Sequence, residues 1–331
     1  MKIVTAKDVT LDLLKDTPIA VIGYGAQGRA QALCLRDSGL QVIVGVREGG
    51  PSWTRAREDG FSPVPIAAAA QKAEIIHILL PDEWHKALYD SDIAPHVSPG
   101  KTLSFSHGFS IVHRRIVPPK GVDVILVAPK SPGTEERKAF VAGFGVPGLV
   151  AVAQDASGKA RDKALVLAHG LGLTRAGVLE CTFEDETIED LFGEQAVLCG
   201  GTAELIKAGF ETLVEAGYPP EMAYFECLHE LKLIVDLIYE GGLGHMWNVV
   251  SNTAEYGGRT LGTKIITADT KKAMKGLLDN IQNGQFARDW VEEFERGMPN
   301  LERLRREEAE HPIERVGKKV RALFVKKGTG E

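Results

Sequence analysis

The chain has 331 residues and carries 45 acidic against 39 basic residues, a net charge of -6 that, without any basic run, argues against a nucleic-acid partner. No stretch reaches the ~18 apolar residues of a membrane span, and the charged N-terminus lacks the apolar segment of a signal peptide, so we expect a cytoplasmic protein without a membrane partner. The length exceeds what one hydrophobic core usually supports and predicts two domains.

The first half of the chain alternates short apolar runs with helical patterns. The runs occupy residues 19–23, 41–46, 74–80, 101–106, 122–128 and 149–153. Because Ile, Val and Leu follow one another in them almost without interruption, we expect strands that are buried on both faces. The pattern therefore predicts an α/β fold with a doubly wound parallel sheet and helices on both sides.

A glycine motif directly follows the first of these runs. It consists of Gly23, Tyr24, Gly25, Ala26, Gln27 and Gly28. The motif follows a predicted buried strand and opens a predicted helix, the context in which glycines allow a tight turn and bring a pyrophosphate close to helix N–H groups. A glycine-rich turn without a ligand is the ordinary alternative. The context favours a dinucleotide site.

The end of the second apolar run carries groups that bear on cofactor choice. Arg47 and Glu48 stand there, and Ser52 follows shortly after. An acid about 20 residues beyond the glycines binds a ribose 2′-hydroxyl, whereas a nearby arginine can bind a 2′-phosphate. Ser52 could add a hydrogen bond to either group. These residues by themselves leave both NADH and NADPH open.

Three loops that follow later runs are expected to face the same crevice, because ligands of open α/β sheets bind beyond the carboxyl ends of the strands. The loops carry Asp82, Glu83, Trp84 and His85, then His107, then Lys130 and Gly133. His107 is a candidate for proton transfer, with a hydrogen-bonding wall of the cofactor site as the alternative. Lys130 could neutralise an anionic substrate or a carboxylate ligand, or could be an ordinary solvated lysine.

The pattern changes after Cys181 to long segments with a helical period, broken by glycine or proline pairs at 200–201, 219–220, 241–244 and 257–258. We therefore predict two domains, 1–181 and 182–327, of which the second is entirely helical. The four cysteines show neither CxxC spacing nor a histidine in ligand spacing. We expect them to be reduced core residues and not a metal site.

Two acidic pairs, Asp190/Glu194 and Glu226/Glu230, have i,i+4 spacing and lie on the apolar stripes of their predicted helices, facing the expected core. Like charges in such a place repel, and burying them unpaired is costly, so a cation should lie between them. Carboxylate oxygens without a companion His or Cys favour Mg²⁺ or Mn²⁺. Two solvated acidic faces are the alternative for either pair alone. The presence of two such pairs favours a metal site.

Several segments, in order along nearly the whole chain, resemble the ketol-acid reductoisomerase (acetohydroxyacid isomeroreductase) family. They are GYGAQG at 23–28, HGF at 107–109, APKSPGTE at 128–135, GFGVP at 143–147, EDLFGEQAVLCGG at 189–201, FECLHELKLIVDLIYEGG at 225–242 and SNTAEYG at 251–257. The resemblance implies a Rossmann-like domain followed by an all-α, knotted domain, a rare exception to unknotted topology. The length is similar to that of the family's short form, which implies a homodimer or a larger homo-oligomer with shared active sites.

The resemblance also implies a reaction. The small-molecule substrates are 2-acetolactate and 2-aceto-2-hydroxybutyrate, which undergo alkyl migration and NAD(P)H reduction to 2,3-dihydroxy acids in valine, leucine and isoleucine biosynthesis. The matching positions are Asp190, Glu194, Glu226 and Glu230 for two Mg²⁺ ions per site, Ser251 for the substrate, and His107 and Lys130 on the nucleotide-domain side. We expect Glu230 to move the hydroxyl proton as well as to bind metal, with a purely ligating role as the alternative.

Gly50 bears on the cofactor, because it stands where relatives often have a serine that donates to a 2′-phosphate. Arg47 still offers a charge-assisted contact, which is roughly twice as strong as a neutral hydrogen bond. We therefore expect use of both NADPH and NADH, with a slight lean to NADH.

Two other classes of protein remain open at this point. One is a metal-independent NAD(P)-dependent dehydrogenase of hydroxyacids or imines, against which the four acidic stripe residues argue. The other is a noncatalytic dinucleotide sensor, which would leave those acids unexplained.

Overall fold

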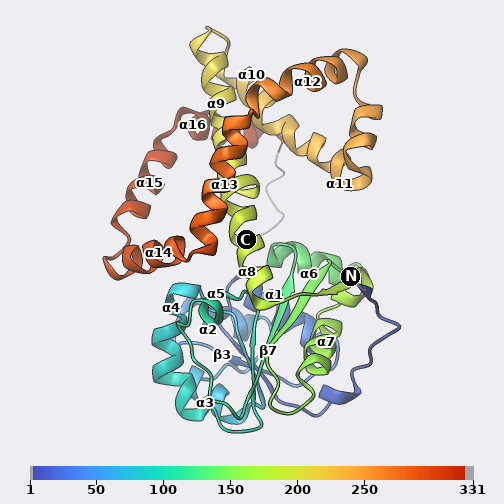
Figure 1. Ribbon diagram of the computed structural model, residues 1–331, viewed down its shortest axis with the longest axis vertical. Coiled ribbons are helices and arrows are strands. Elements are labelled where there is room, and N and C mark those ends of the chain that lie inside the picture. Colours follow the sequence, from blue (N-terminus) through green and yellow to red (C-terminus); the bar gives the residue numbers. More distant parts are fainter. Residues whose placement is uncertain (1–2, 325–331) are drawn as a thin grey trace. The chain divides into compact units, whose positions relative to one another are not determined.

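The computed structural model describes residues 3–324, and the chain divides into two compact units, Met1–Glu189 and Asp190–Glu331 (Figure 1). The division falls inside helix α8 (Phe183–Gly193), a little beyond the predicted boundary at 181/182. Residues 325–327 of the predicted second domain lie outside the described residues.

An eight-stranded sheet forms the centre of the first unit, with the strand order β1-β8-β7-β6-β5-β4-β2-β3. Its strands are β1 (Ile3–Val4), β2 (Ile19–Ile22), β3 (Val42–Gly45), β4 (Ile75–Ile78), β5 (Thr102–Phe105), β6 (Asp123–Pro129), β7 (Gly148–Gln154) and β8 (Val178–Glu180). The predicted apolar runs are all confirmed as strands. β1 and β8 escaped prediction because strands of two and three residues are too short to show a pattern.

Helices cover both faces of this sheet. They are α1 (Ala26–Asp37), α2 (Pro51–Glu58), α3 (Ile66–Lys72), α4 (Asp82–Leu88), α5 (Phe109–Val112), α6 (Gly133–Val141), α7 (Ala160–Gly170) and the start of α8, with short 3₁₀ or π turns at Asp12–Leu14, Tyr89–Ile93, Ala94–His96 and Leu173–Arg175. Val21 and Val127 share a buried cluster with residues of α1 and α7, whereas their neighbours Ile22 and Ala128 share another with α3. This alternation confirms the doubly wound arrangement.

The direction of β7 differs from the prediction of an all-parallel sheet. β7 runs antiparallel to β6, with Gly148 opposite Pro129. The connection returns the chain to the end of the sheet that it left, where the Lys130 N–H donates to the Pro147 carbonyl at 2.9 Å. Helix α6 of this connection packs against α1 instead of crossing back along the sheet. The apolar content of a strand indicates that it is buried but not in which direction it runs, so the sequence pattern could not predict the antiparallel direction of β7.

The second unit is helical over its described residues, as predicted. Its helices are α9 (Gly200–Glu215), α10 (Pro220–Tyr224), α11 (Glu230–Val249), α12 (Asn252–Ile265), α13 (Ala268–Gln282), α14 (Gln285–Glu295), α15 (Pro299–Glu310) and α16 (Pro312–Phe324), with π turns at Glu194–Leu198 and Phe225–His229. Within residues 3–324, none of the helices is long and apolar enough to cross a membrane.

Most of the predicted helix breaks coincide with helix starts or a kink, and one prediction was wrong. α9 begins at Gly200, α10 begins at Pro220, and Gly242 kinks α11 with a φ of 78°. The glycine pair at 257–258 lies inside α12 instead. A Cβ on Gly258 would come within 2.7 Å of the Trp247 indole, so this glycine serves close packing and does not end the helix.

The core of the second unit is small. Its fully buried apolar cluster consists of Phe210, Ala223, Tyr224, Ile313 and Val320. Many large apolar side chains are exposed in this chain instead, namely Val197, Leu198, Leu205, Tyr218, Met222, Leu233, Val235, Tyr239, Leu243, Val249, Tyr256, Leu261, Ile265 and Ile266. Cys199 is exposed as well, which corrects the expectation of four core cysteines. Large apolar side chains exposed in such number are typical of a surface that a partner covers.

The acidic stripes do not face the core of this chain, contrary to our expectation. Glu194, Glu226 and Glu230 are exposed, and so are Val197 and Leu198 of the first stripe. The periodicity of an isolated helix shows that one side is apolar but does not show whether the same chain or another covers it. Both acidic pairs adjoin π turns, which are frequent at functional sites.

Candidate active site

The glycine loop between β2 and α1 has the geometry of a dinucleotide-binding turn. Gly23 has a φ of +100°, and a Cβ there would lie 2.6 Å from the Leu79 carbonyl oxygen. A Cβ on Gly28 would lie 2.3 Å from the Gly23 carbonyl oxygen, so this glycine allows the helix to pack on the strand. Around Gly25, the exposed N-cap of α1, the space is open. Gly23 therefore serves the turn and Gly28 the packing, while Gly25 leaves the open space that the approach of a pyrophosphate requires.

The side chain of Tyr24 belongs to the core, so only its backbone faces the predicted ligand region. Its hydroxyl donates to Asp59 at 2.9 Å, and Arg29 donates twice to the same carboxylate at 2.7 and 2.8 Å. Burial and this hydrogen bond raise the pKa of Tyr24, whereas the Arg29 contact lowers the pKa of Asp59. The cluster ties the end of α2 to the glycine loop.

The neighbouring loop also closes on the glycine motif. The Gln27 amide nitrogen donates to the Ser131 carbonyl at 2.9 Å. A Cβ on Gly133 would lie 2.4 Å from the Ala26 carbonyl oxygen, so glycine is required for this approach. The 131–133 segment thus holds the N-terminus of α1 from the side.

The segment after β3 combines a cation, an anion and a helix N-terminus. Arg47 and Glu48 are exposed, and Gly50 is the N-cap of α2 without a side-chain cap. A Cβ on Gly50 would lie 3.5 Å from the Arg47 Nε atom. Ser52 Oγ makes only a long contact of 3.5 Å with the Tyr24 carbonyl. A side chain at position 50 would therefore meet the arginine that we expect to contact a 2′-phosphate.

His85 makes structural contacts inside the first unit, and its role as a cofactor contact stays a prediction. It is buried, with Nδ1 2.9 Å from Ser110 Oγ and Nε2 2.8 Å from the Leu80 carbonyl oxygen. Burial lowers its pKa, so the imidazole is neutral and joins α4 to α5. Asp82 and Glu83 lie in the first turn of α4, and the Trp84 side chain is partly exposed.

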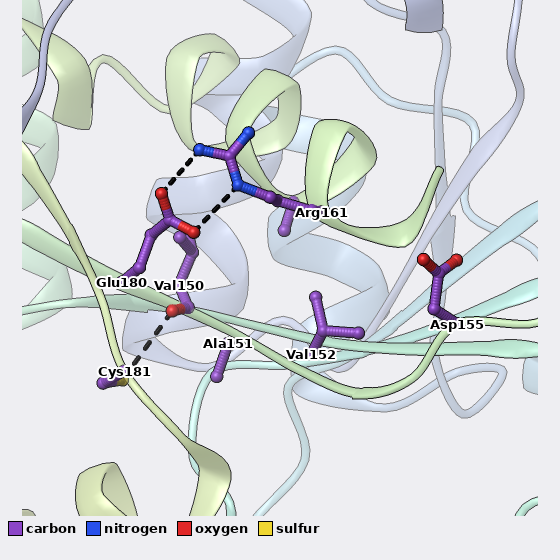
Figure 2. A pocket seen from close by; sticks show the side chains of 8 residues that line it. Val150, Ala151, Val152, Asp155, Arg161, Glu180 and Cys181 are labelled. Atoms are coloured by element: carbon purple, nitrogen blue, oxygen red, sulfur yellow. Dashed lines mark hydrogen bonds and ion pairs between the residues drawn. The ribbon is translucent and has the colours of Figure 1, made fainter. Parts of the chain in front are cut away.

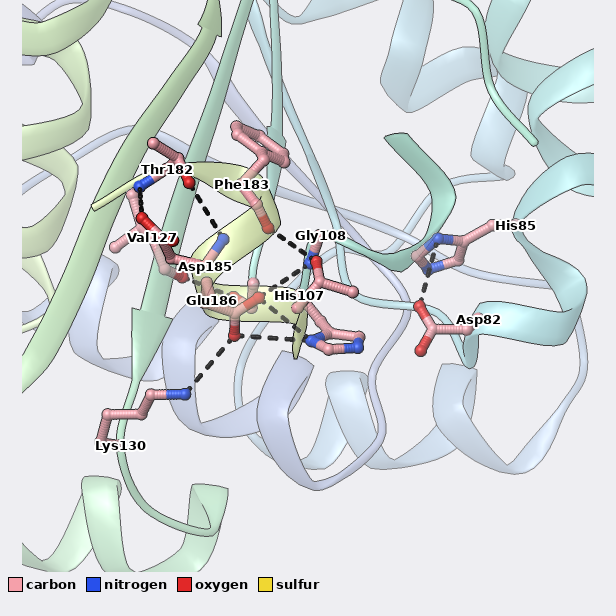
Figure 3. A network of polar contacts seen from close by, with 12 residues as sticks. Asp82, His85, His107, Gly108, Val127, Lys130, Thr182, Phe183, Asp185 and Glu186 are labelled. Atoms are coloured by element: carbon pink, nitrogen blue, oxygen red, sulfur yellow. Dashed lines mark hydrogen bonds and ion pairs between the residues drawn. The ribbon is translucent and has the colours of Figure 1, made fainter. Parts of the chain in front are cut away.

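Glu186 on α8 is the centre of a polar cluster (Figure 3). One carboxylate oxygen accepts from the Gly108 N–H at 3.0 Å and lies 3.2 Å from His107 Nδ1. The other lies 3.5 Å from Lys130 Nζ. Only 1% of Glu186 is exposed, and a Cβ on Gly108 would collide with Thr187 at 2.2 Å. The predicted residues His107 and Lys130 therefore meet on a buried carboxylate.

Glu186 was missed by the sequence reasoning, although a signal was present. Glu186, Asp190 and Glu194 follow one another at intervals of four, so the first acidic pair extends by one helical turn toward the N-terminus of α8. The apolar neighbours Val197 and Leu198 follow Glu194, so the pattern indicates only that end of the stripe.

The residues around α8 could hold a metal ion. His107, Glu186 and Asp190 each offer one ligand atom, and these atoms lie within 4.8 Å of one another. Two of these atoms are carboxylate oxygens, which suit a hard divalent ion such as Mg²⁺. The third is a nitrogen of His107, so the group differs from the all-carboxylate set that the sequence predicts. Of the four predicted ligands, only Asp190 belongs to this group; among the described residues, Glu194, Glu226 and Glu230 belong to no such group. Ser251 is the N-cap of α12, where its hydroxyl accepts from the Ala254 N–H at 3.2 Å.

A pocket elsewhere in the first unit is separate from these groups (Figure 2). It lies beside β7, α7 and β8 and is lined by Val150, Ala151, Val152, Asp155, Arg161, Ala164, Glu180 and Cys181. Arg161 and Glu180 satisfy each other through hydrogen bonds of 2.9 and 2.6 Å. None of the predicted site residues lines this pocket.

A glycine loop on a doubly wound sheet, with a carboxylate–histidine–lysine cluster in the same unit, is typical of a dinucleotide-dependent oxidoreductase. Family models place the "Acetohydroxy acid isomeroreductase, NADPH-binding domain" at residues 13–177 and the "Ketol-acid reductoisomerase, C-terminal domain" at 183–326. The chain therefore belongs to the ketol-acid reductoisomerase family.

Individual relatives match over almost the full length. A ketol-acid reductoisomerase (NAD(+)) of the uncultured archaeon GZfos26G2 is 57% identical over 99% of this chain and 100% of its own. A ketol-acid reductoisomerase (NADP(+)) of Akkermansia muciniphila is 59% identical over 98% and 99%. The solved structure of an NADH-preferring ketol-acid reductoisomerase from an uncultured archean superposes with a TM-score of 0.96 at 56% identity, covering 98% of this chain and 100% of that one. These matches favour the reductoisomerase over the dehydrogenase and sensor alternatives.

Proposed function

We propose that this chain converts 2-acetolactate and 2-aceto-2-hydroxybutyrate to 2,3-dihydroxy acids in the cytoplasm, with Mg²⁺ and NAD(P)H. The observation that carries the proposal is the buried Glu186, which holds both His107 and Lys130 in the same unit as the glycine loop. The two carboxylates that α8 contributes, Glu186 and Asp190, fit Mg²⁺, and His107 is the one nitrogen donor beside them. Bound there, the metal supplies Lewis acidity toward the hydroxyl, carbonyl and carboxylate oxygens of the substrate.

The protein's own residues bind the cofactor and the substrate and transfer the proton. The N-terminus of α1 at Gly25 binds the pyrophosphate and so positions the nicotinamide. Lys130 offers positive charge to the anionic substrate, and His107 donates or accepts a hydrogen bond beside it. Glu230 receives the hydroxyl proton before alkyl migration, and Ser251 hydrogen-bonds the substrate. Glu186 keeps the histidine and lysine in place for these steps.

The assay for this function is oxidation of NAD(P)H with acetolactate, in the presence and absence of EDTA. We expect turnover with Mg²⁺ and its loss with EDTA. Turnover that continues unchanged in EDTA would favour a metal-independent dehydrogenase, and cofactor binding without any turnover would favour a sensor.

We further propose that the active site is shared between two copies of the chain. Asp190 lies in the metal-capable group of its own chain, whereas Glu226 and Glu230 lie on an exposed helix face flanked by exposed apolar residues. A second copy that covers this face would bury the apolar side chains and bring the second acidic pair to a partner's Asp190. Larger homo-oligomers are compatible with this arrangement.

Subunit mixing should restore activity from two inactive variants. Asp190→Asn and Glu226→Gln proteins, each inactive alone, form hybrid dimers in which one of the two sites has all its ligands. We expect up to about half of the wild-type activity per hybrid dimer, measured by acetolactate-dependent NADPH oxidation after subunit exchange. Wild-type protein mixed with either variant should keep its total activity, which controls for losses caused by the exchange procedure itself. An absence of recovery, with exchange demonstrated by differently tagged subunits, would place all four ligands in one chain.

For the cofactor we propose use of both NADH and NADPH, with a slight lean to NADH. The two relatives named above carry different cofactors in their names, and both match this chain at similar identity. In this chain Arg47 offers charge to a 2′-phosphate, while the exposed Glu48 repels it or accepts from a free 2′-hydroxyl.

Replacement of Gly50 by serine should shift the preference toward NADPH. The new hydroxyl stands at the N-cap of α2, next to Arg47, and adds a donor for the 2′-phosphate. One such hydrogen bond to a charged group is worth about 1.5–3 kcal/mol, so the ratio of kcat/KM values should move by about tenfold or more. Steady-state kinetics with both cofactors measure it, with Gly50→Ala as the control for the added Cβ. A wild-type preference for NADPH that the serine leaves unchanged would contradict our interpretation of Glu48.

A further inference from the structure

A buried histidine in the middle of the sheet takes no part in the site described above. His77 lies on β4 and is fully buried. Its Nδ1 atom lies 2.8 Å from Ser104 Oγ on β5, and its Nε2 atom lies 2.6 Å from Gln31 Oε1 on α1. Gln31 is fully buried too. Burying a polar group costs free energy unless the group is hydrogen-bonded, so His77 and Gln31 must each keep these hydrogen bonds.

The orientation of the Gln31 amide, with its oxygen toward His77, assigns the protons of this contact. The carbonyl oxygen of Gln31 can only accept, so Nε2 of His77 carries the hydrogen and Nδ1 accepts from the Ser104 hydroxyl. Burial lowers the pKa of His77 to about 4, which keeps the ring neutral and so keeps one nitrogen as an acceptor. With its oxygen facing His77, Gln31 must direct its amide nitrogen to the opposite side. That nitrogen donates to Gln27 Oε1 and to Ser106 Oγ, each at 3.1 Å.

The hydrogen bonds continue from Gln31 to the loops of the site. Gln27 accepts through its oxygen and therefore donates through its nitrogen, to the Ser131 carbonyl at 2.9 Å. Ser106 donates to the Val127 carbonyl at 2.8 Å, the shorter of its two acceptor contacts. Gln27 belongs to the glycine loop, Ser131 directly follows Lys130, and Ser106 directly precedes His107. One directed chain of hydrogen bonds thus reaches all three loops.

We infer that His77 is a positioning residue for the reductoisomerase reaction. Its Nε2–H group fixes the orientation of the Gln31 amide. Through its hydrogen bonds, this amide fixes the positions of the glycine loop and of the loops of His107 and Lys130 relative to one another. Without that donor the Gln31 amide is free to rotate, and its oxygen would then oppose the oxygen of Gln27. The inference rests on the proposed function, because it concerns the residues that we place beside the substrate.

The test compares two variants of similar size, His77→Met and His77→Gln, in the full-length protein. Glutamine places an N–H donor near the position of Nε2, whereas methionine fills the same space without one. We expect His77→Met to lower kcat by about tenfold to a hundredfold, since small misplacements of catalytic groups cost rates of this order. It should also weaken NADH binding, measured by fluorescence titration without substrate. His77→Gln should recover most of both losses at a similar melting temperature.

A control variant separates positioning from stability. Thr102 is a fully buried polar residue on β5 whose hydroxyl lies 3.0 Å from Lys163 Nζ, in contacts that reach none of the three loops. Thr102→Val should lower the melting temperature without changing kcat of the folded enzyme.

Three results would overturn the inference. The first is a wild-type kcat and NADH affinity in His77→Met. The second is an equal loss of kcat in His77→Gln and His77→Met. The third applies if His77→Met does not fold, and is wild-type kinetics in Gln31→Glu. The last variant keeps the acceptor for His77 and loses both amide donors, so reduced kcat in it supports the inference. Failure of the wild-type enzyme to consume acetolactate would instead contradict the proposed function, and the NADH affinities would still decide the role of His77.

Discussion

Asp190→Asn or Glu226→Gln should abolish the alkyl migration while nucleotide binding stays intact. Each substitution keeps the shape of the side chain but removes the negative charge that a hard divalent cation needs. The loss in kcat should exceed the roughly 10- to 100-fold cost of removing an outer partner of a metal ligand, because a ligand itself is lost. Acetolactate-dependent NADPH oxidation at saturating Mg²⁺ measures the effect, and NADPH fluorescence checks that the cofactor still binds.

Glu189→Gln is the matched control for this prediction. Glu189 is an exposed acid on the same helix, adjacent in sequence to Asp190 but outside the metal-capable group. It should keep near wild-type turnover. If either ligand variant turned acetolactate over at a wild-type rate in EDTA, the metal assignment would be wrong.

Glu136 should make the stability of the protein fall as the pH rises above about 5. It lies on α6, is only 1% exposed, and neither of its carboxylate oxygens has a hydrogen-bond partner among the described residues. Burial raises its pKa from 4.5 to about 8. The titratable groups close to it are Cys34 on α1 and Arg137, which donates to the Cys34 sulfur at 3.8 Å and pairs with Asp37. The arginine is therefore engaged elsewhere and does not compensate the Glu136 charge.

The sign of the effect follows from the direction of the shift. Because the folded-state pKa lies above the unfolded-state value, the contribution of this group to stability is fully present below about pH 4.5. It is lost progressively as the pH rises through about 8. A shift of this size corresponds to roughly 4–5 kcal/mol of the free energy of unfolding. Glu136→Leu should therefore raise the melting temperature most at pH 8–9 and remove this part of the pH dependence.

Denaturant unfolding from pH 5 to 9 measures this prediction for the wild type, Glu136→Leu and Glu136→Gln. Glu135→Gln is the matched control, because Glu135 is the exposed neighbour that pairs with Lys138. The control should reproduce the wild-type pH profile. Parallel profiles for the wild type and both Glu136 variants would show that this carboxyl is solvated or paired in the folded protein.

Local patterns along the chain were sufficient to predict most of the fold. Buried strands, the glycine turn at Gly23 and helix breaks at Gly200 and Pro220 each have a cause within a few residues, either burial on both faces or a backbone conformation that favours glycine or proline. The antiparallel direction of β7 and the continuous helix across 257–258 were not predictable in this way. They depend on contacts of Lys130 with Pro147 and of Gly258 with Trp247, pairs that are separated along the chain.

In the candidate site, too, the sequence indicated residue types, whereas contacts between distant segments decided their arrangement. The sequence indicated His107 and Lys130 as candidates but left a solvated lysine and a hydrogen-bonding histidine open as alternatives. The fold places both on Glu186, a residue that the sequence did not single out. For His85 the fold shows contacts that the sequence did not indicate, because Ser110 and the Leu80 carbonyl occupy both ring nitrogens.

By itself, the sequence determined the class of the protein, the dinucleotide-binding turn and the acidic pairs, since each depends on residue types at short, regular spacings. The tertiary structure decided which of these groups meet and which side of each helix is covered. The first acidic pair extends to a buried Glu186, and the second lies exposed among apolar side chains of the same chain. The physical reason is that burial, and with it the cost of an unpaired charge, is set by what packs against a side chain, and the packing partners are distant in sequence.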